Sequence, residues 1–78
     1  MKEVKVLLND VERIVEFVGI LDKINVNADL GQGNTRIDAR SMIGVMTMDT
    51  RKPVTLIINE NDEKADKVIE NIKSFIME

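Results

Sequence analysis

Four short segments of this chain alternate apolar and polar residues, and two longer segments carry apolar residues at steps of three and four. Alternation with a period of two is typical of a strand with one buried face, whereas steps of three and four are typical of an amphipathic helix. The predicted strands span residues 3–8, 24–30, 35–40 and 53–59, and the predicted helices span residues 10–23 and 62–77. The apolar stripe of the first helix comprises Val11, Ile14, Val15, Val18, Leu21 and Ile24, all expected to face the core.

Residues at the segment boundaries support this assignment. Asn9 or Asp10 can cap the first helix, because a short polar side chain accepts a hydrogen bond from the free amides of a helix start. The sequence GQGN, residues 31–34, supplies the glycine and asparagine that a tight turn between two strands favours. Pro53 follows a polar link and begins the last predicted strand.

The segment RSMIGVMTM, residues 40–48, gathers five large apolar side chains behind a serine. Ser41 is expected to open a helix of about two turns over residues 41–48. On so short a helix only two or three of these side chains can face inward, so the others are expected to be exposed. Exposed methionines suit protein contact, because the flexible thioether adapts to different partners. The alternative is that the segment closes one end of the core. The five side chains are Met42, Ile43, Val45, Met46 and Met48.

The resulting order, βαββαβα, predicts one domain over residues 1–78 of the α+β class. Each strand has one apolar face and each long helix has one apolar stripe. A four-stranded sheet with the helices on one face and water on the other satisfies both patterns.

Composition excludes several functions. The net charge of −3 and the absence of Trp and Tyr argue against nucleic-acid binding, which needs clustered cations and stacking rings. The chain has no histidine and no cysteine, and no metal-ligand cluster or phosphate-binding glycine motif. We therefore expect no enzyme activity, cofactor or metal. No apolar run approaches the ~20 residues of a membrane span, so no membrane partner is expected.

RSMIGVMTM and the following KPVTLIINENDEKADKVIENI resemble HPr, the phosphocarrier of the bacterial sugar phosphotransferase system (PTS). The resemblance covers nearly the whole chain in element order and is sharpest over residues 40–48, where it is closest to the Gram-positive and Crh-like type. It implies an open-faced β-sandwich with strand order 1-4-2-3 and a cytoplasmic protein.

The sequence departs from the HPr pattern in the loop that carries the phosphoryl acceptor of the family. HPr proteins carry a histidine that accepts a phosphoryl group, in a loop patterned Gly-hydrophobic-His-x-Arg-Pro-Ala. Counting back from Ser41 without gaps places Asp10 at the histidine position, Glu12 at the arginine position and Arg13 at the proline position. The phosphoryl transfer that is usual in the family therefore has no acceptor histidine in this chain. Asp10 is either a helix cap or a replacement acceptor that would form an acyl phosphate.

Ser41 aligns with the serine that HPr kinase/phosphorylase modifies in Gram-positive HPr and in Crh, after which the protein binds the repressor CcpA. A phosphate there would meet a helix N-terminus. The alternative is an ordinary serine cap. The resemblance implies partner contacts through Met42, Ile43, Met46 and Met48. It implies protein partners such as the kinase, a CcpA-like repressor or PTS components, and a monomer or weak dimer.

Three functions therefore compete. The favoured one is a non-catalytic, HPr-like regulatory or adaptor protein controlled at Ser41. The second is an atypical phosphocarrier that uses Asp10. The third, a ferredoxin-like interaction domain, is disfavoured by the short middle helix and the extra C-terminal helix.

Overall fold

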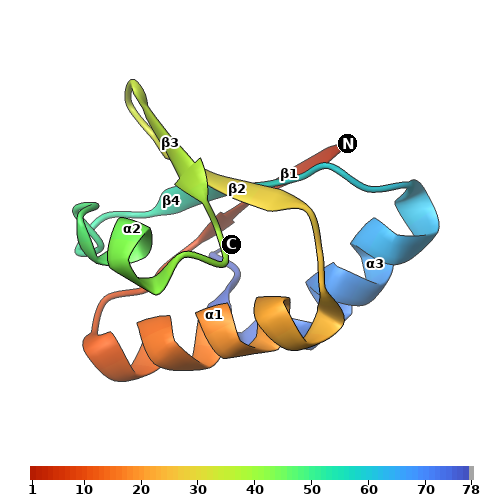
Figure 1. Cartoon of the computed structure of the whole chain (residues 1–78), viewed down its shortest axis with the longest axis horizontal. Coiled ribbons are helices and arrows are strands. Elements are labelled where there is room, and N and C mark those ends of the chain that lie inside the picture. Colours follow the sequence, from red (N-terminus) through yellow and green to blue (C-terminus); the bar gives the residue numbers. More distant parts are fainter. Residues whose placement is uncertain (78) are drawn as a thin grey trace.

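The computed structural model describes residues 1–77 of the chain. Its helices and strands follow the predicted order, with a short 3₁₀ turn near the C-terminus (Figure 1). The elements are β1 (Lys2–Val6), α1 (Val11–Ile24), β2 (Ala28–Gln32), β3 (Thr35–Asp38), α2 (Met42–Met46), β4 (Val54–Ile58), α3 (Asp62–Asn71) and η1 (Lys73–Phe75).

The four strands form one antiparallel sheet in the order β1-β4-β2-β3, which confirms the predicted topology. The register places Val4 opposite Leu56, Leu56 opposite Leu30, and Leu30 opposite Ile37. This row of apolar residues crosses the sheet on the face that the helices cover. Figure 1 shows α1 and α3 on the same side of the sheet. The predicted α+β architecture with helices on one face is therefore confirmed.

The core lies between the sheet and the helices and is entirely apolar in the part of the chain that the structure describes. Phe17 of α1 and Phe75 of η1 meet edge to face, with ring centroids 5.4 Å apart. Such an aromatic pair adds ~0.5–1.5 kcal/mol beyond the burial of its surface. It joins the middle of α1 to the C-terminal segment.

The hairpin turn and the first helix end are set by two residues with positive φ. Gly33 has a φ of 59° in the two-residue turn between Gln32 and Thr35, as the GQGN sequence predicts. Asn25 has a φ of 59° and ends α1. Ile24 is therefore the last residue of α1, and the prediction that it begins the second strand is wrong. The strand starts at Ala28 because Asn25 reverses the chain first.

The last helix is shorter than the predicted 62–77. Helix α3 ends at Asn71, and η1 follows before the backbone becomes extended at Ile76. There the chain pairs with the edge of β1: the Met77 amide donates to the Lys5 carbonyl at 2.9 Å, and the Leu7 amide donates to the Phe75 carbonyl at 2.9 Å. These backbone hydrogen bonds compensate for the helical bonds that a longer α3 would make.

Candidate functional site

Helix α2 begins at Met42 because Ser41 caps it. The Ser41 Oγ accepts a hydrogen bond from the Gly44 amide at 3.2 Å, and Ser41 is exposed. Gly44 allows this close turn: a Cβ there would lie 3.1 Å from the Ser41 Oγ and 3.3 Å from the Ile37 Cδ1. The capping geometry that the sequence offered for Ser41 is therefore present.

The apolar side chains of this segment divide between core and solvent. Val45 is fully buried and Met42 is partly buried against the core. Ile43 is 81% exposed and Met46 is 48% exposed, in agreement with the expectation that only two or three side chains face inward. Met48 is only 8% exposed, so the expectation of an accessible methionine side chain at this position is wrong. It lies beyond the end of α2 and packs in the core.

Helix α1 adds two exposed valines, although the spacing of its apolar residues predicts that both lie in the buried stripe. Val11 is 62% exposed and Val15 is 49% exposed, whereas Ile14, Phe17 and Val18 are buried. Val11 and Val15 are four residues apart and share one flank of the helix. Their position at the margin of the stripe was the signal available in the sequence. It is weak because a margin residue is buried or exposed depending on its neighbours.

The exposed large apolar residues are not scattered over the molecule. In the described part of the chain, two of the six are Met1 and Met77, close to the ends of the sequence, and the other four belong to α1 and α2. These two helices are in contact, and α2 lies beside the N-terminal half of α1 (Figure 1). We call Val11, Val15, Ile43 and Met46 the α1–α2 apolar surface.

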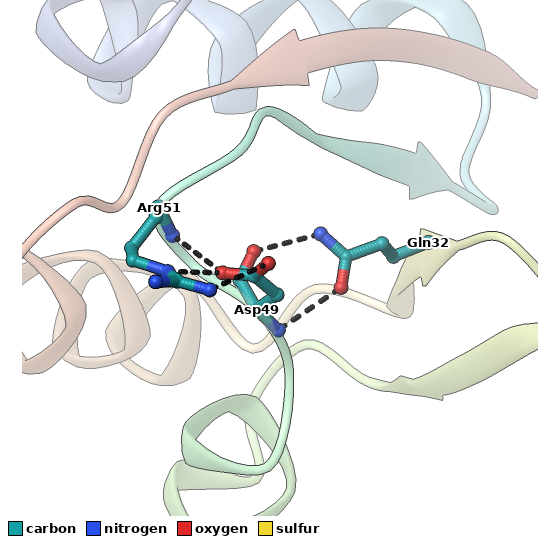
Figure 2. Close-up of polar contacts among 3 residues, drawn as sticks. All are labelled: Gln32, Asp49 and Arg51. Carbon is teal, nitrogen blue, oxygen red and sulfur yellow. Dashed lines mark hydrogen bonds and ion pairs between the residues drawn. The ribbon is translucent and has the colours of Figure 1, made fainter.

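The chain following α2 is held in place by a side chain of β2. Figure 2 shows Asp49 between Gln32 and Arg51. The Gln32 Nε2 donates to the Asp49 carbonyl at 2.7 Å, and the Asp49 amide donates to the Gln32 Oε1 at 3.0 Å. The Arg51 Nε donates to the Asp49 Oδ1 at 3.0 Å. The two Gln32–Asp49 hydrogen bonds hold the chain that follows α2 against the β2–β3 hairpin. They therefore give the short helix a defined position.

The loop before α1 is fixed by Arg13. Its guanidinium donates to the Leu7 carbonyl at 3.1 and 3.2 Å and to the Ser74 carbonyl at 3.1 Å. The guanidinium carbon also lies 4.6 Å from the centre of the Phe75 ring, a cation–π contact. Arg13 therefore ties the loop to the C-terminal segment, and its charge is directed toward that segment.

Asp10 is the N-cap of α1. Its Oδ1 accepts a hydrogen bond from the Arg13 amide at 2.8 Å, which is the capping geometry. None of the ion pairs formed within residues 1–77 includes Asp10, and the neighbouring Glu12 is exposed. Residues 1–77 contain no group of acidic side chains arranged to hold a metal ion. The observed geometry is that of a helix cap.

Arg40, which precedes Ser41, is directed to the other end of α1. Its Nη1 donates to the Asn25 Oδ1 at 2.6 Å. Close by, the Glu60 carboxylate accepts from the Asn27 amide at 2.8 Å and pairs with Lys64. These hydrogen bonds, the one from Asn27 foremost, lower the pKa of the Glu60 carboxyl. The hydrogen bond from the Arg51 guanidinium likewise lowers the pKa of the Asp49 carboxyl.

Comparison with known proteins agrees with this architecture. A family model described as the PTS HPr component phosphorylation site matches residues 12–78. The chain therefore belongs to the HPr family, whose members are phosphocarriers of the phosphotransferase system and not catalysts. The matched residues begin at Glu12 and so do not include Asp10.

Solved structures share this fold. The crystal structure of HPr-C-His from Thermoanaerobacter tengcongensis superposes with a TM-score of 0.72 and 22% sequence identity, over 92% of this chain and 90% of that one. No curated protein matches the sequence at a significant level. None of the helices formed by residues 1–77 has the length and apolar content needed to cross a bilayer.

Proposed function

We propose that this HPr-family protein is a non-catalytic adaptor that docks partner proteins through the α1–α2 apolar surface. The observation that supports it best is the distribution of exposed apolar residues: away from the two ends of the described chain, the large ones all lie on these two adjacent helices. Apolar side chains exposed on adjacent elements of a small protein indicate an interaction site. Ile43, the most exposed of the four, is the expected centre of the contact.

The surroundings of Asp10 support the non-catalytic part of this proposal. The sequence contains no histidine, so the family's phosphoryl acceptor has no counterpart here. An aspartyl phosphate at Asp10 would need a cationic group or a metal to offset its charge. The nearest cationic side chain in sequence, Arg13, donates instead to the Leu7 and Ser74 carbonyls. Glu12 adds negative charge beside the same helix start.

Phosphorylation of Ser41 is the proposed means of regulation. Its hydroxyl is exposed and already accepts a hydrogen bond from the Gly44 amide. A phosphate there adds a charge of about −1.5 to −2 directly beside Met42 and Ile43. It would therefore change the electrostatics of the docking surface without a change of fold. The proposed partners remain HPr kinase/phosphorylase, a CcpA-like repressor or PTS components.

Docking is tested by titrating the isotope-labelled protein with each of these purified partners and following its amide NMR signals. We expect at least one partner to perturb the signals of α1 and α2. Ile43→Ser should weaken that binding at least tenfold, a loss of ~1.4 kcal/mol or more. Met77→Ser is the control, because Met77 is also an exposed large apolar residue but lies near the C-terminal end of the sequence, outside the α1–α2 apolar surface. Equal binding by both variants would contradict the proposed surface.

The two phosphorylation hypotheses are separated by mass spectrometry. HPr kinase with ATP should add one phosphate to the protein and none to Ser41→Ala. Enzyme I with phosphoenolpyruvate should add none. A phosphate that Enzyme I adds and that Asp10→Asn abolishes would establish the phosphocarrier alternative in place of the adaptor.

A further inference from the structure

Acidic residues run alongside the apolar surface on α1. Glu12 and Glu16 are four residues apart and exposed, and each follows Val11 or Val15 by one position. Successive residues of an α-helix are about 100° apart around its axis. The Glu12–Glu16 row therefore lies directly beside the Val11–Val15 row. The exposed carboxylate of Asp10 precedes both rows at the start of the helix.

Arg13, the cationic residue in the first two turns of α1, does not offset the negative charge of Glu12 and Glu16. Arg13 lies about half a turn from both Val11 and Val15. Its guanidinium contacts the C-terminal segment at Ser74 and Phe75, on the opposite flank of the helix. The first two turns of α1 therefore present carboxylates next to the valines, while their guanidinium is directed away.

Helix α2 leaves this imbalance in place, because it contains no charged residue. In the loop after α2, the Arg51 guanidinium is paired with the Asp49 carboxylate. Arg40, which precedes the Ser41 cap, donates to the Asn25 side chain at the C-terminal end of α1. Lys52 in the loop after α2 and Lys23 in the last turn of α1 are well separated from Glu12 along the chain. The α1 side of the surface is thus acidic, and the α2 side is apolar and uncharged.

We propose that the partner is a protein segment with an apolar face bordered by lysine or arginine, which it places opposite the first two turns of α1. This inference rests on the proposed docking function and adds the charge of the partner. A cationic border pairs with Glu12 and Glu16 while the apolar face covers Ile43 and Val15. An acidic border at the same place meets like charge, which lowers the affinity for such partners.

Two helical peptides of about 18 residues serve as probes. They share one leucine stripe and differ only in the residues bordering it, which are lysines in one peptide and glutamates in the other. Binding is measured by calorimetry, and the contact is located by amide shifts. We expect the lysine-bordered peptide to bind about tenfold more tightly, since it gains two ion pairs with Glu12 and Glu16 and avoids two repulsions. Added salt should reduce this preference.

Charge-reversed variants provide the decisive control. Glu12→Lys/Glu16→Lys should invert the preference between the peptides. Glu63→Lys/Glu70→Lys makes the same change in net charge at exposed positions of α3 and should leave the preference intact. Equal effects of the two double variants would mean that net charge alone sets the preference, and this would overturn the inference.

The failure of this inference is distinguishable from failure of the docking function. If both peptides bind equally well and Ile43→Ser abolishes both interactions, the apolar surface stands and the charge inference is wrong. If neither peptide binds, or if binding ignores Ile43, the proposed docking function falls together with the inference.

Discussion

Helix α3 carries apolar side chains only where it packs on the sheet, whereas α1 and α2 also carry them where they meet solvent. Ala65 and Val68 of α3 are buried, Ile69 is partly buried, and the other residues of the helix are polar or charged. In contrast, α1 and α2 leave four large apolar residues exposed. Both regions cover the same face of one sheet, so the fold does not require the difference.

The comparison separates residues that stabilise the fold from residues that are free to bind. Burial on the α3 side contributes to the free energy of unfolding. The exposed side chains of α1 and α2 contribute little to it, since they remain in water in the folded state. Mutations on the α3 side should therefore change the free energy of unfolding, and mutations of the exposed residues of α1 and α2 should change binding.

The largest effect is expected from a pair of isoleucines. Ile72 is fully buried where α3 ends, and Ile43, the isoleucine of α2, is 81% exposed. Ile72→Ala should lower the free energy of unfolding by ~2–5 kcal/mol, because it leaves a cavity. Ile43→Ala should change it by less than ~0.5 kcal/mol. Urea denaturation measures both. A large loss in Ile43→Ala would show that the side chain supports the fold.

The next effect concerns Arg13, which links the two regions. Arg13→Met removes hydrogen bonds to the Leu7 and Ser74 carbonyls and the contact with the Phe75 ring. We expect a loss of ~2 kcal/mol in the free energy of unfolding. Arg36→Met, which removes an exposed ion pair with Asp29, is the control and should cost less than ~1 kcal/mol. Equal losses would mean that the Arg13 contacts do not anchor the loop.

Loss of a helix cap should change the free energy of unfolding by an intermediate amount. Ser41 caps α2 and Asn61 caps α3, each accepting a hydrogen bond from the amide three residues later. Replacing either by alanine should cost ~0.5–2 kcal/mol. Ser41→Ala must therefore be shown to be folded before it is used in a phosphorylation assay, which circular dichroism establishes. Ser41→Gly, expected to lose only a few tenths of a kcal/mol, is the second variant without a hydroxyl.

A stabilising change is predicted on the exposed side of α1. Gly19 lies inside the helix, and a Cβ there would meet no atom within 4 Å. Gly19→Ala should therefore raise the free energy of unfolding by ~0.5–1 kcal/mol through helix propensity. The same change at Gly44 would press against Ser41 and Ile37 and should not give this gain. A loss of stability in Gly19→Ala would reveal a contact on a surface that should be open.

The smallest effects are those of pH. Hydrogen bonds lower the pKa of the Glu60 and Asp49 carboxyls in the folded state. The stability that these ionised carboxyls contribute is therefore present above their unfolded-state pKa, and it is lost as the pH falls through their folded-state pKa. The denaturation midpoint should fall on acidification below about pH 4. The sequence has no histidine or cysteine, the residues whose ordinary side-chain pKa lies nearest neutrality, so the midpoint should be nearly flat between about pH 6 and 8.

Variants show whether these carboxyls carry the acid dependence. Glu60→Gln should reduce the fall of the midpoint at low pH, whereas Glu70→Gln, at an exposed position of α3, should leave it unchanged. A steep change of stability near neutral pH would contradict the assignment.

The sequence predicted most of the fold because each element follows a local rule. Alternation located the strands, the 3.6-residue period located α1 and α3, and GQGN located the hairpin turn at Gly33. Local rules were insufficient at three places. Asn25 ends α1 before the predicted strand, the C-terminal chain leaves α3 to pair with β1, and Met48 packs in the core. The last two outcomes depend on residues distant in the sequence, whereas the end of α1 at Asn25 is a local left-handed cap bonded to the Leu21 and Asp22 carbonyls.

For the candidate site, the sequence alone determined that the chain lacks a phosphoryl-accepting histidine, that Ser41 can cap a short helix, and that this helix has more apolar residues than it can bury. Only the tertiary structure decided which of them are exposed, and that Val11 and Val15 of the neighbouring helix α1 are exposed as well. The physical reason is that exposure depends on what packs against a side chain. Residue type and spacing define a helix face, but the placement of α2 beside α1 determines which part of that face remains in water.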